Sequence, residues 1–274
     1  MEVGARVPAR VAEPVGPSSD GPASAAREAG GRWPLALQGL VGRLAAPVCV
    51  PLAVLVMRAG FGWRIRDAAR SRALYTRLLG EGPRPLLVAA NHLTMVDSAL
   101  IAWGLGSAAG HVVRYRGLPW NVPEQSRVES SWLWRVLAYL VKCLPIPRGG
   151  ERRLVAQVLE RLRHLMRRGE VVLMFPEGGR SRTGRVDAES VAQGVGRLLQ
   201  EVGDCRVLCV YLRGDAQGSW SDLPARGDTF TLTTRLVEPR TSLRGLRASR
   251  DLASQVLGHL VEMEQAYWSE RAVR

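Results

Sequence analysis

Lysine is almost absent from this 274-residue chain: Lys142 is the only one among 38 basic residues, so nearly all of the positive charge is arginine. With 25 acidic residues, the formal net charge is +13. Arginine keeps its charge and binds phosphate or carboxylate through a planar fork. This excess is compatible with nucleic acid, an anionic membrane surface or an anionic substrate as partner, although an arginine-rich proteome would produce it too.

Cysteine is scarce and dispersed. The four cysteines show no metal-ligand clustering, and the closest two stand four residues apart with no second pair or histidine nearby. This spacing disfavours a zinc site, and the chain is too long to need a disulfide scaffold. We therefore expect buried thiols in a reducing compartment and no zinc site. The cysteines are Cys49, Cys143, Cys205 and Cys209.

The first 30 residues lack the apolar centre of a signal peptide and are rich in Gly, Pro, Ala and Ser, so residues 1–32 are predicted to be disordered. The stretch LAAPVCVPLAVLVM, residues 44–57, is strongly apolar, contains two prolines and has an arginine at each end. Its 14 residues are fewer than the ~20 of a spanning helix. We interpret residues 33–82 as an apolar, membrane-associating and amphipathic helical segment; the alternative for residues 44–57 is a buried core helix broken by proline.

Apolar runs typical of buried strands alternate with amphipathic helices between residues 83 and 240, and no internal repeat is evident. This alternation predicts an α/β domain with a largely parallel sheet flanked by helices. A helix is expected over residues 63–80, and a period-two pattern predicts a strand at the edge of the sheet over residues 228–239. Residues 241–274 are predicted to form one or two helices. The predicted buried strands are residues 85–90, 171–175 and 207–212.

Polar residues follow the first buried strand directly. In LLVAANHLTMVD, Asn91 and His92 end the apolar run and Asp97 comes five residues after the histidine. If His92 lies in the turn before a helix and Asp97 in its first turn, the carboxylate can accept a hydrogen bond from one imidazole nitrogen and leave the other as a base. The alternative at this point is that Asn91 and Asp97 are capping residues only.

The second buried strand ends in FPEGGRSRTG, a glycine-rich loop that contains Glu177, Arg180 and Arg182. Glycines permit close backbone approach to a ligand, and arginines bind phosphate. In a mostly parallel sheet, ligands collect where strands end and helices begin, so this loop and His92 are candidates for one site. A solvated surface loop is the alternative.

With these motifs in order, the sequence resembles the 1-acylglycerol-3-phosphate acyltransferase family, also described as lysophosphatidic acid acyltransferase-like. NHLTMVD matches the first family block, LPIPR with Ile146 and Arg148 the second, FPEGGRSRTG the third and VLCVYLRG the fourth, over roughly residues 86–214. Thr94 stands where serine is common, which keeps a hydroxyl group. Gly179 replaces a usual threonine, which leaves the identity of the acyl acceptor open.

The resemblance implies a membrane-associated enzyme that transfers a fatty acyl group from acyl-CoA or acyl-carrier protein to a lysophospholipid, with 1-acylglycerol-3-phosphate as the expected acceptor. It implies His92 as general base oriented by Asp97, with no metal or bound cofactor. It also implies a peripheral or monotopic position on the cytoplasmic face of the cell membrane. The resemblance further implies acceptor binding by Arg148, at its phosphate, and by Glu177, Gly178 and Arg180.

The sequence allows three other interpretations: a different acceptor and two different classes of protein. The enzyme could acylate a different lyso-lipid or glycolipid. A basic nucleic-acid-binding protein is disfavoured, because the arginines are dispersed and the aromatic residues lie in apolar runs; no nucleic-acid partner is expected. A catalytically inactive membrane-surface protein is disfavoured by the presence of both His92 and Asp97.

Overall fold

The computed structural model describes residues 22–82, 84–147, 152–189 and 191–272. A π-helical turn, Val56–Gly60, follows the first helix, and a 3-10 turn, Tyr115–Gly117, follows the fourth. The helices are α1 (Pro22–Leu55), α2 (Ala68–Gly80), α3 (Asp97–Leu105), α4 (Ala108–Val113), α5 (Gln125–Glu129), α6 (Trp132–Leu140), α7 (Arg152–Arg167), α8 (Gln193–Val202) and α9 (Gly245–Ala272). The strands are β1 (Arg64–Arg66), β2 (Leu86–Ala90), β3 (Trp120–Asn121), β4 (Val172–Met174), β5 (Arg206–Gly214) and β6 (Thr229–Val237).

The α/β fold predicted from the sequence is confirmed. Within the described residues, the strands form one six-stranded sheet in the order β1-β6-β5-β2-β4-β3. All neighbouring pairs are parallel except β5 and β6, which are antiparallel. The register places Leu86 of β2 opposite Arg206 of β5, and Leu87 opposite Val172 of β4. The carboxyl ends of β2, β4 and β5 therefore meet at one edge of the sheet.

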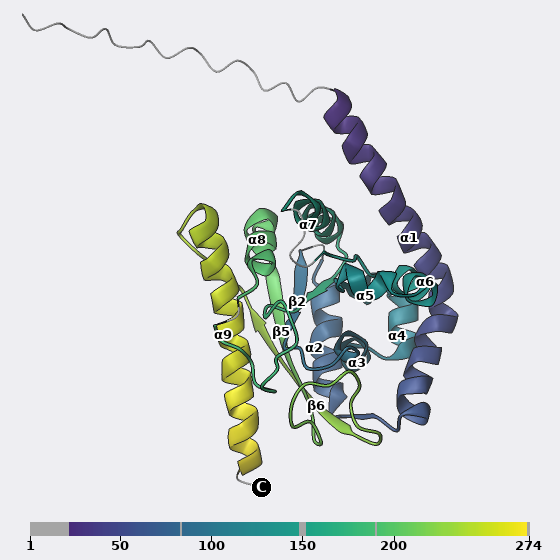
Figure 1. The fold of residues 1–274 in the computed structure, drawn as a ribbon, viewed down its shortest axis with the longest axis vertical. Coiled ribbons are helices and arrows are strands. Elements are labelled where there is room, and N and C mark those ends of the chain that lie inside the picture. Colours follow the sequence, from purple (N-terminus) through teal and green to yellow (C-terminus); the bar gives the residue numbers. More distant parts are fainter. Residues whose placement is uncertain (1–21, 83, 148–151, 190, 273–274) are drawn as a thin grey trace, which may run out of the picture.

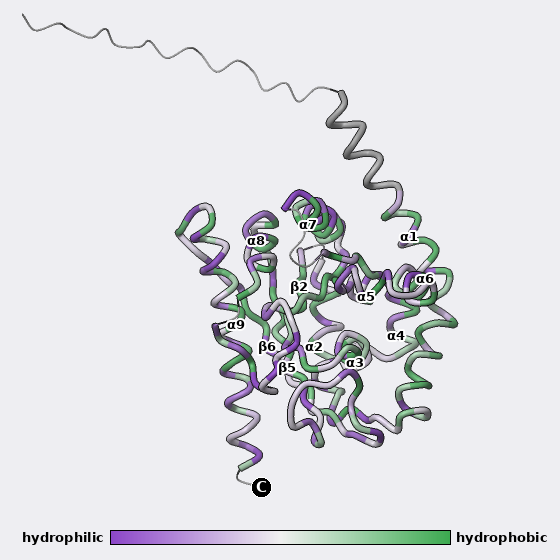
Figure 2. The backbone as a smooth tube through the Cα atoms, in the orientation of Figure 1, coloured by the Kyte–Doolittle hydropathy of each residue, from purple (hydrophilic) through white to green (hydrophobic). Residues whose placement is uncertain are grey.

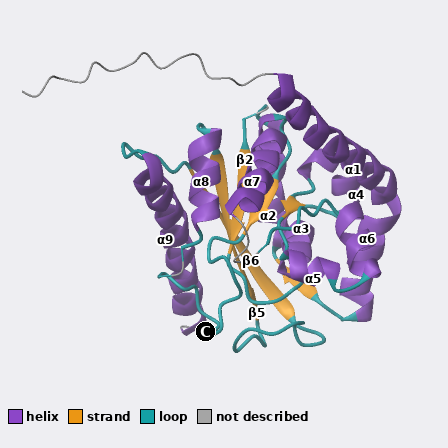
Figure 3. Cartoon of the chain, turned by 45° about the horizontal axis from the view of Figure 1, so that its top comes forward, coloured by secondary structure: helices purple, strands orange, loops and turns teal. Residues whose placement is uncertain are grey.

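Helices cover both faces of the sheet (Figure 3). Alternate residues along each buried strand point to opposite faces, so β2 contributes Leu87 and Ala89 to one core and Leu86 and Val88 to the other. The first core is completed by α7, α8 and α9, and the second by α2 and α3. Because β2, β4 and β5 are apolar on both faces, they read as continuous hydrophobic runs in the sequence.

Two local predictions were wrong. Residues Arg64–Arg66, at the start of the helix predicted over 63–80, form the short strand β1, which pairs with β6 in parallel. As a result, β6 lies between β1 and β5 and is not the edge strand that its alternating pattern predicted. Residues Arg64–Arg66 have no run of apolar residues that would predict a strand. They form one only because β6 lies beside them and pairs with them.

The N-terminal apolar helix is longer than the 14-residue apolar stretch. Pro34–Gly60, 27 residues with a mean hydropathy of 2.1, is long and apolar enough to cross a membrane by length and composition. The helix is not broken at Pro47 or Pro51 but continues through both. It also begins at Pro22, inside the segment for which composition predicted disorder. This apolar helix indicates membrane association, and Figure 2 shows it as a mainly hydrophobic element at the edge of the molecule.

Specific contacts hold α1 along the side of the domain, next to α4 and α6 (Figure 1). The Gln38 side-chain amide donates to the carbonyls of Tyr139 (3.2 Å) and Cys143 (3.0 Å). At Gly42 the two parts approach so closely that a Cβ atom would lie 2.2 Å from the Tyr115 hydroxyl and 2.9 Å from the Leu140 carbonyl. The side of α1 that contains Gln38 and Gly42 is therefore an internal packing surface of the protein.

We expect Gly42→Val to displace α1 and to lower stability by about 1–3 kcal/mol, because the added side chain overpacks a close contact. Gly39→Val is the matched control, since a Cβ at Gly39 meets nothing within 4 Å. Thermal unfolding of both variants in the same detergent tests this. Equal melting temperatures for the two variants would show that α1 is not packed at Gly42.

Candidate active site

The two residues singled out after the first buried strand contact each other. α3 begins at Asp97, and His92 lies in the turn before it. His92 Nδ1 is 3.0 Å from Asp97 Oδ2. The same oxygen accepts the backbone N–H groups of Leu93 (2.6 Å) and Thr94 (2.8 Å), and Oδ1 accepts the Thr94 hydroxyl (2.5 Å). Asp97 thus closes the turn and also contacts the imidazole, so the capping and catalytic interpretations describe the same carboxylate.

This arrangement fixes the state of the imidazole. A carboxylate can only accept hydrogen bonds, so Nδ1 of His92 carries the proton and Nε2 is left with a free lone pair. The Asp97 side chain is 3% exposed and the His92 side chain 15%, so the histidine is the member of the pair that a ligand can reach. Phe175 stacks on the imidazole, with ring centroids 4.0 Å apart and 13° between planes, which restricts its rotation.

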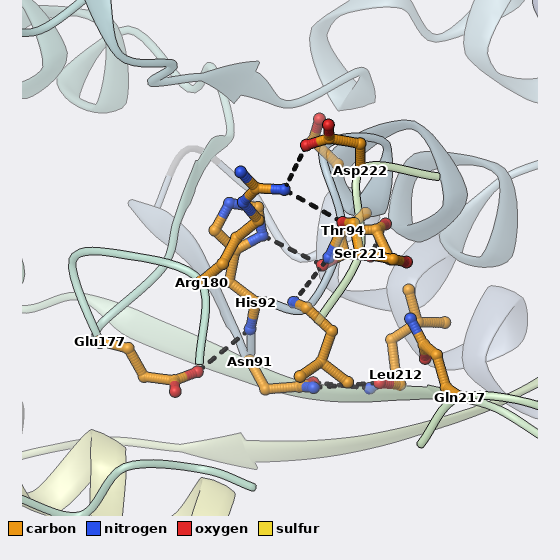
Figure 4. Close-up of polar contacts among 12 residues, drawn as sticks. Asn91, His92, Thr94, Glu177, Arg180, Leu212, Gln217, Ser221 and Asp222 are labelled. Carbon is orange, nitrogen blue, oxygen red and sulfur yellow. Dashed lines mark hydrogen bonds and ion pairs between the residues drawn. The ribbon is translucent and has the colours of Figure 1, made fainter. Parts of the chain in front are cut away.

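The loop after β4 meets the turn after β2 directly. Glu177 Oε1 accepts the backbone N–H of His92 (3.1 Å), and the Ser181 N–H donates to the His92 carbonyl (2.9 Å). Figure 4 shows Glu177 beneath the histidine backbone. The geometry places Glu177 where it supports the turn that carries His92; the buried carboxylate also accepts the N–H of Asp187 (3.2 Å).

Burial raises the pKa of the Glu177 carboxyl to about 7, against the opposing effect of its two backbone N–H donors. The nearby carboxylates of Glu264 and Asp187 act in the same direction as burial. Glu264 belongs to α9 and accepts the N–H of Val186 (3.0 Å), so the last helix also supports this loop. A carboxyl group in such surroundings titrates close to neutral pH.

Gly178 lies in the tight turn that opens this loop. Its N–H donates to the Phe175 carbonyl (3.0 Å), and its φ of +68° is in the left-handed region that favours glycine. A Cβ atom there would lie 3.0 Å from the Ala192 Cβ. The requirement for glycine at this position is therefore explained by the turn that brings Phe175 and Glu177 to His92.

Arg180 binds a neighbouring loop in this structure. Its guanidinium donates to the Ser221 carbonyl (3.0 Å) and to Asp222 (2.7 Å) (Figure 4). It also lies over the Trp220 ring. The same loop, between β5 and β6, forms backbone hydrogen bonds with residues 93 and 95. Arg180 thus holds this loop next to the turn of residues 92–97. The Arg180 side chain is 21% exposed.

Two polar residues outside the predicted set of site residues anchor the site to β5. The Asn91 side chain, considered from the sequence only as a capping residue, exchanges two hydrogen bonds with the backbone of Leu212, at 3.0 and 2.8 Å. Arg213, fully buried, donates to the carbonyls of Gly184 and Gln217 and so joins the loops that follow β4 and β5. The sequence analysis missed Arg213; a charged residue at the end of an apolar strand, as in VLCVYLRG, is the signal that could have found it.

Arg148, assigned to the acceptor phosphate by resemblance, lies outside the described residues. The segment before it is extended and forms parallel bridges, Cys143 with Asn121 and Ile146 with Glu124. It therefore runs in the same direction as β3 and β4, toward the edge where His92 lies. Arg182, in the third motif, is exposed.

No group of three or more His, Cys, Asp or Glu side chains among the described residues is placed to hold a metal ion. The side chains at this edge that could take part in a reaction are His92, its buried partner Asp97, and Arg180 in the glycine-rich loop. Such a set suits proton abstraction from a ligand hydroxyl beside an anion-binding loop.

Fold and site together define an α/β domain with a histidine–aspartate pair at the carboxyl edge of its parallel strands. The sequence matches the Acyltransferase family over residues 71–213, slightly more than half of the chain, and the protein belongs to that family. It is accordingly an acyltransferase with an O-acyltransferase domain for lipid-type acceptors. No protein of curated function matches the chain.

We expect the contribution of Glu177 to the free energy of unfolding to fall as pH rises from about 4.5 to about 7, because the folded protein keeps the Glu177 proton that the unfolded chain releases. Glu177→Gln removes this titration. The wild-type advantage over the variant should therefore decrease by about 3 kcal/mol across that range. Denaturant unfolding at pH 5 and pH 7.5 measures it, with Glu270→Gln on α9 as the charge-matched control. The same pH response in both variants would contradict a buried titrating Glu177.

Proposed function

We propose that the protein transfers a fatty acyl group from a thioester, acyl-CoA or acyl-carrier protein, to the hydroxyl of a lysophospholipid, with 1-acylglycerol-3-phosphate as the first acceptor to test. The observation that carries this proposal is the contact between His92 Nδ1 and the buried Asp97 carboxylate, which leaves Nε2 free at the edge of the sheet. The family to which the chain belongs supports acyl transfer as the reaction.

In the proposed reaction, Nε2 of His92 takes the proton from the acceptor hydroxyl as its oxygen attacks the thioester carbonyl carbon. A C–O bond forms, the C–S bond breaks, and the thiolate receives the proton from the imidazolium. Asp97 stabilises the positive charge on the imidazolium and holds it in one tautomer. The acceptor attacks directly, so no covalent acyl-enzyme and no metal or bound cofactor is required.

The acceptor phosphate would be bound by arginine. Arg148 is the first candidate, since the extended segment before it runs toward the catalytic edge. Arg180 is the second, and its bond with Asp222 would have to be shared or exchanged when the phosphate binds. Arginine supplies two parallel donors to a phosphate, which a lysine cannot. Gly179 lacks the hydroxyl of the threonine usual in the family at this position, so the acceptor is a matter for assay.

We further propose a monotopic position on the cytoplasmic face of the membrane. The surface of α1 turned away from the domain is apolar, and the neighbouring helix α6 adds a second apolar surface with two exposed tryptophans. Because α1 packs along the domain, a transmembrane position would draw α4 and the turn after it into lipid. We call the combined exposed surface the α1–α6 face; it comprises Leu37, Leu40, Leu44, Val48, Leu52, Leu55 and Val56 with Trp132, Leu133, Trp134, Val136, Leu137, Tyr139 and Val141.

Such a surface is larger than soluble monomers usually expose, and apolar patches of this kind bind membranes or partners. Tryptophan favours the boundary between headgroups and acyl chains, which fits α6. A helix that lies in the interface with one face in lipid would give the acceptor a short route from the bilayer to the domain.

The reaction is tested by incubating the purified protein with acyl-CoA and a panel of lysophospholipids and lyso-glycolipids, with products identified by mass spectrometry. We expect His92→Ala to lower kcat by about 10²–10⁴-fold, the usual contribution of a general base. Asp97→Asn should also be severe, because it disturbs the tautomer. His259→Ala on α9 is the control. Activity above half of wild type in His92→Ala would refute the mechanism.

Membrane association is tested by sedimentation with phosphatidylcholine vesicles. Their headgroups carry no net charge, so the basic protein is not drawn to them by charge alone. Leu44→Glu/Leu52→Glu and Trp132→Glu/Trp134→Glu should each reduce the bound fraction at least tenfold, since each places charges in the α1–α6 face. The matched control is Leu243→Glu/Leu246→Glu, two exposed leucines, one just before α9 and one in its first turn. An equal loss in all three variants would show that the α1–α6 face is not the membrane surface.

A further inference from the structure

A cavity of about 960 Å³ opens at the edge of the sheet opposite His92. Its lining includes Leu86, Val171 and Arg206, which stand at the amino ends of β2, β4 and β5. His92 follows the other end of β2, roughly 20 Å away at 3.3 Å per residue. The cavity is therefore separate from the candidate active site, and the proposed reaction leaves it without a role.

The walls of this distal cavity are part apolar and part strongly basic. On one side lies α1, through Leu35, Gly39 and Arg43, and on the other lie the ends of α2, α4 and α7. Leu78, Leu79 and Leu165 supply apolar surface deeper in the lining. Six arginines surround them: Arg43, Arg84, Arg114, Arg116, Arg168 and Arg206.

The arginines are only partly neutralised. Arg84 pairs with Asp204 and Glu238, and Arg206 pairs with Glu81. Within the described parts of the chain, the other four guanidinium groups have neither a hydrogen bond nor an ion pair. These are Arg43, Arg114, Arg116 and Arg168.

The acid in the lining does not offset this charge. Glu170 is bound by the buried Lys142, the single lysine of the chain, at 2.6 Å, and by the Trp120 indole N–H at 3.0 Å. Lys142 also donates to the carbonyls of Tyr115 and Leu118, so the ion pair of Lys142 with Glu170 is held in place at the bottom of the cavity. Glu170 is therefore compensated, and the free charge around the cavity is positive.

The four unpaired guanidinium groups are the part of the lining that can bind an anion. Arginines without a protein partner are the usual partners of phosphate, to which they donate two parallel hydrogen bonds.

The position of the cavity indicates where its ligand comes from. Leu40 lines the cavity and also belongs to the α1–α6 face, with 54% of its surface exposed, and Val113 on the lining is 80% exposed. The apolar lining is thus continuous with the surface that we place against the bilayer. A free anion would gain nothing from these side chains, whereas the tails of a phospholipid would.

We propose that the distal cavity binds one anionic phospholipid of the membrane, with its phosphate among Arg43, Arg114, Arg116 and Arg168 and its tails over Leu40 and Val113. The bound lipid would bridge α1 and the ends of α2, α4 and α7. This site goes beyond the proposed acyl transfer, and its binding can be measured without turnover, so the two proposals can fail independently.

Isothermal titration of the full-length protein with dihexanoylphosphatidylglycerol, below its micelle concentration, tests the site. We expect saturable one-to-one binding that is at least tenfold tighter than for dihexanoylphosphatidylcholine or inorganic phosphate. Equal affinity for the choline lipid would show that the cavity does not select an anionic headgroup and would overturn the proposal. Equal affinity for inorganic phosphate would show a free-anion site and overturn the lipid assignment.

Two unlike variants locate the binding. Gly39→Phe fills the cavity without a clash at its Cβ atom and leaves every charge in place, so it should abolish binding; Gly258→Phe on α9, also unobstructed, should not. Arg114→Glu/Arg116→Glu should weaken binding at least tenfold, and Arg247→Glu/Arg250→Glu on α9 less than twofold. Unchanged binding in both Gly39→Phe and Arg114→Glu/Arg116→Glu would overturn the proposal.

Discussion

The buried carboxylate of Asp97 organises the turn on which the rest of the site depends. It accepts two backbone N–H groups, one hydroxyl and one imidazole nitrogen within a six-residue stretch. A charge that is 97% removed from water is stable only with such a set of donors. The same bonds that stabilise the carboxylate therefore fix the direction of His92 and the start of α3, so the local fold and the candidate chemistry have a common physical origin.

The parallel sheet brings the other parts to this turn. Glu177, Ser181 and Phe175 follow β4, and Asn91 binds the end of β5, so three neighbouring strands deliver their following loops to one edge. Burial raises the pKa of Glu177, and its carboxyl group accepts the backbone N–H of His92. Glu177, which the resemblance assigned to the acceptor, therefore supports the His92 backbone in this geometry.

The opposite edge of the sheet and the N-terminal helix form a second side of the molecule, for which we propose contact with lipid. From Leu44 to Leu55, α1 carries no charged or polar side chain apart from Cys49, which a helix exposed to water would not sustain, and the domain covers only one side of it. The remaining side, with α6, is a surface that lipid would cover. The arginine-lined cavity behind α1 joins that surface to the amino ends of the strands, so positive charge and apolar area meet where a membrane headgroup would lie.

By itself the sequence determined the buried strands, the α/β class and the two motifs, because continuous apolar runs and their polar ends are local signals. It also predicted the contact of His92 with Asp97, since five residues across a turn limit where the carboxylate can reach. Only the tertiary structure decided the strand β1, the interior position of β6, the uninterrupted α1 and the roles of Arg213 and Asn91. Each of these depends on a partner far away in the chain, as β1 depends on β6 and Arg213 on Gly184, and no local pattern records which partner a segment will meet.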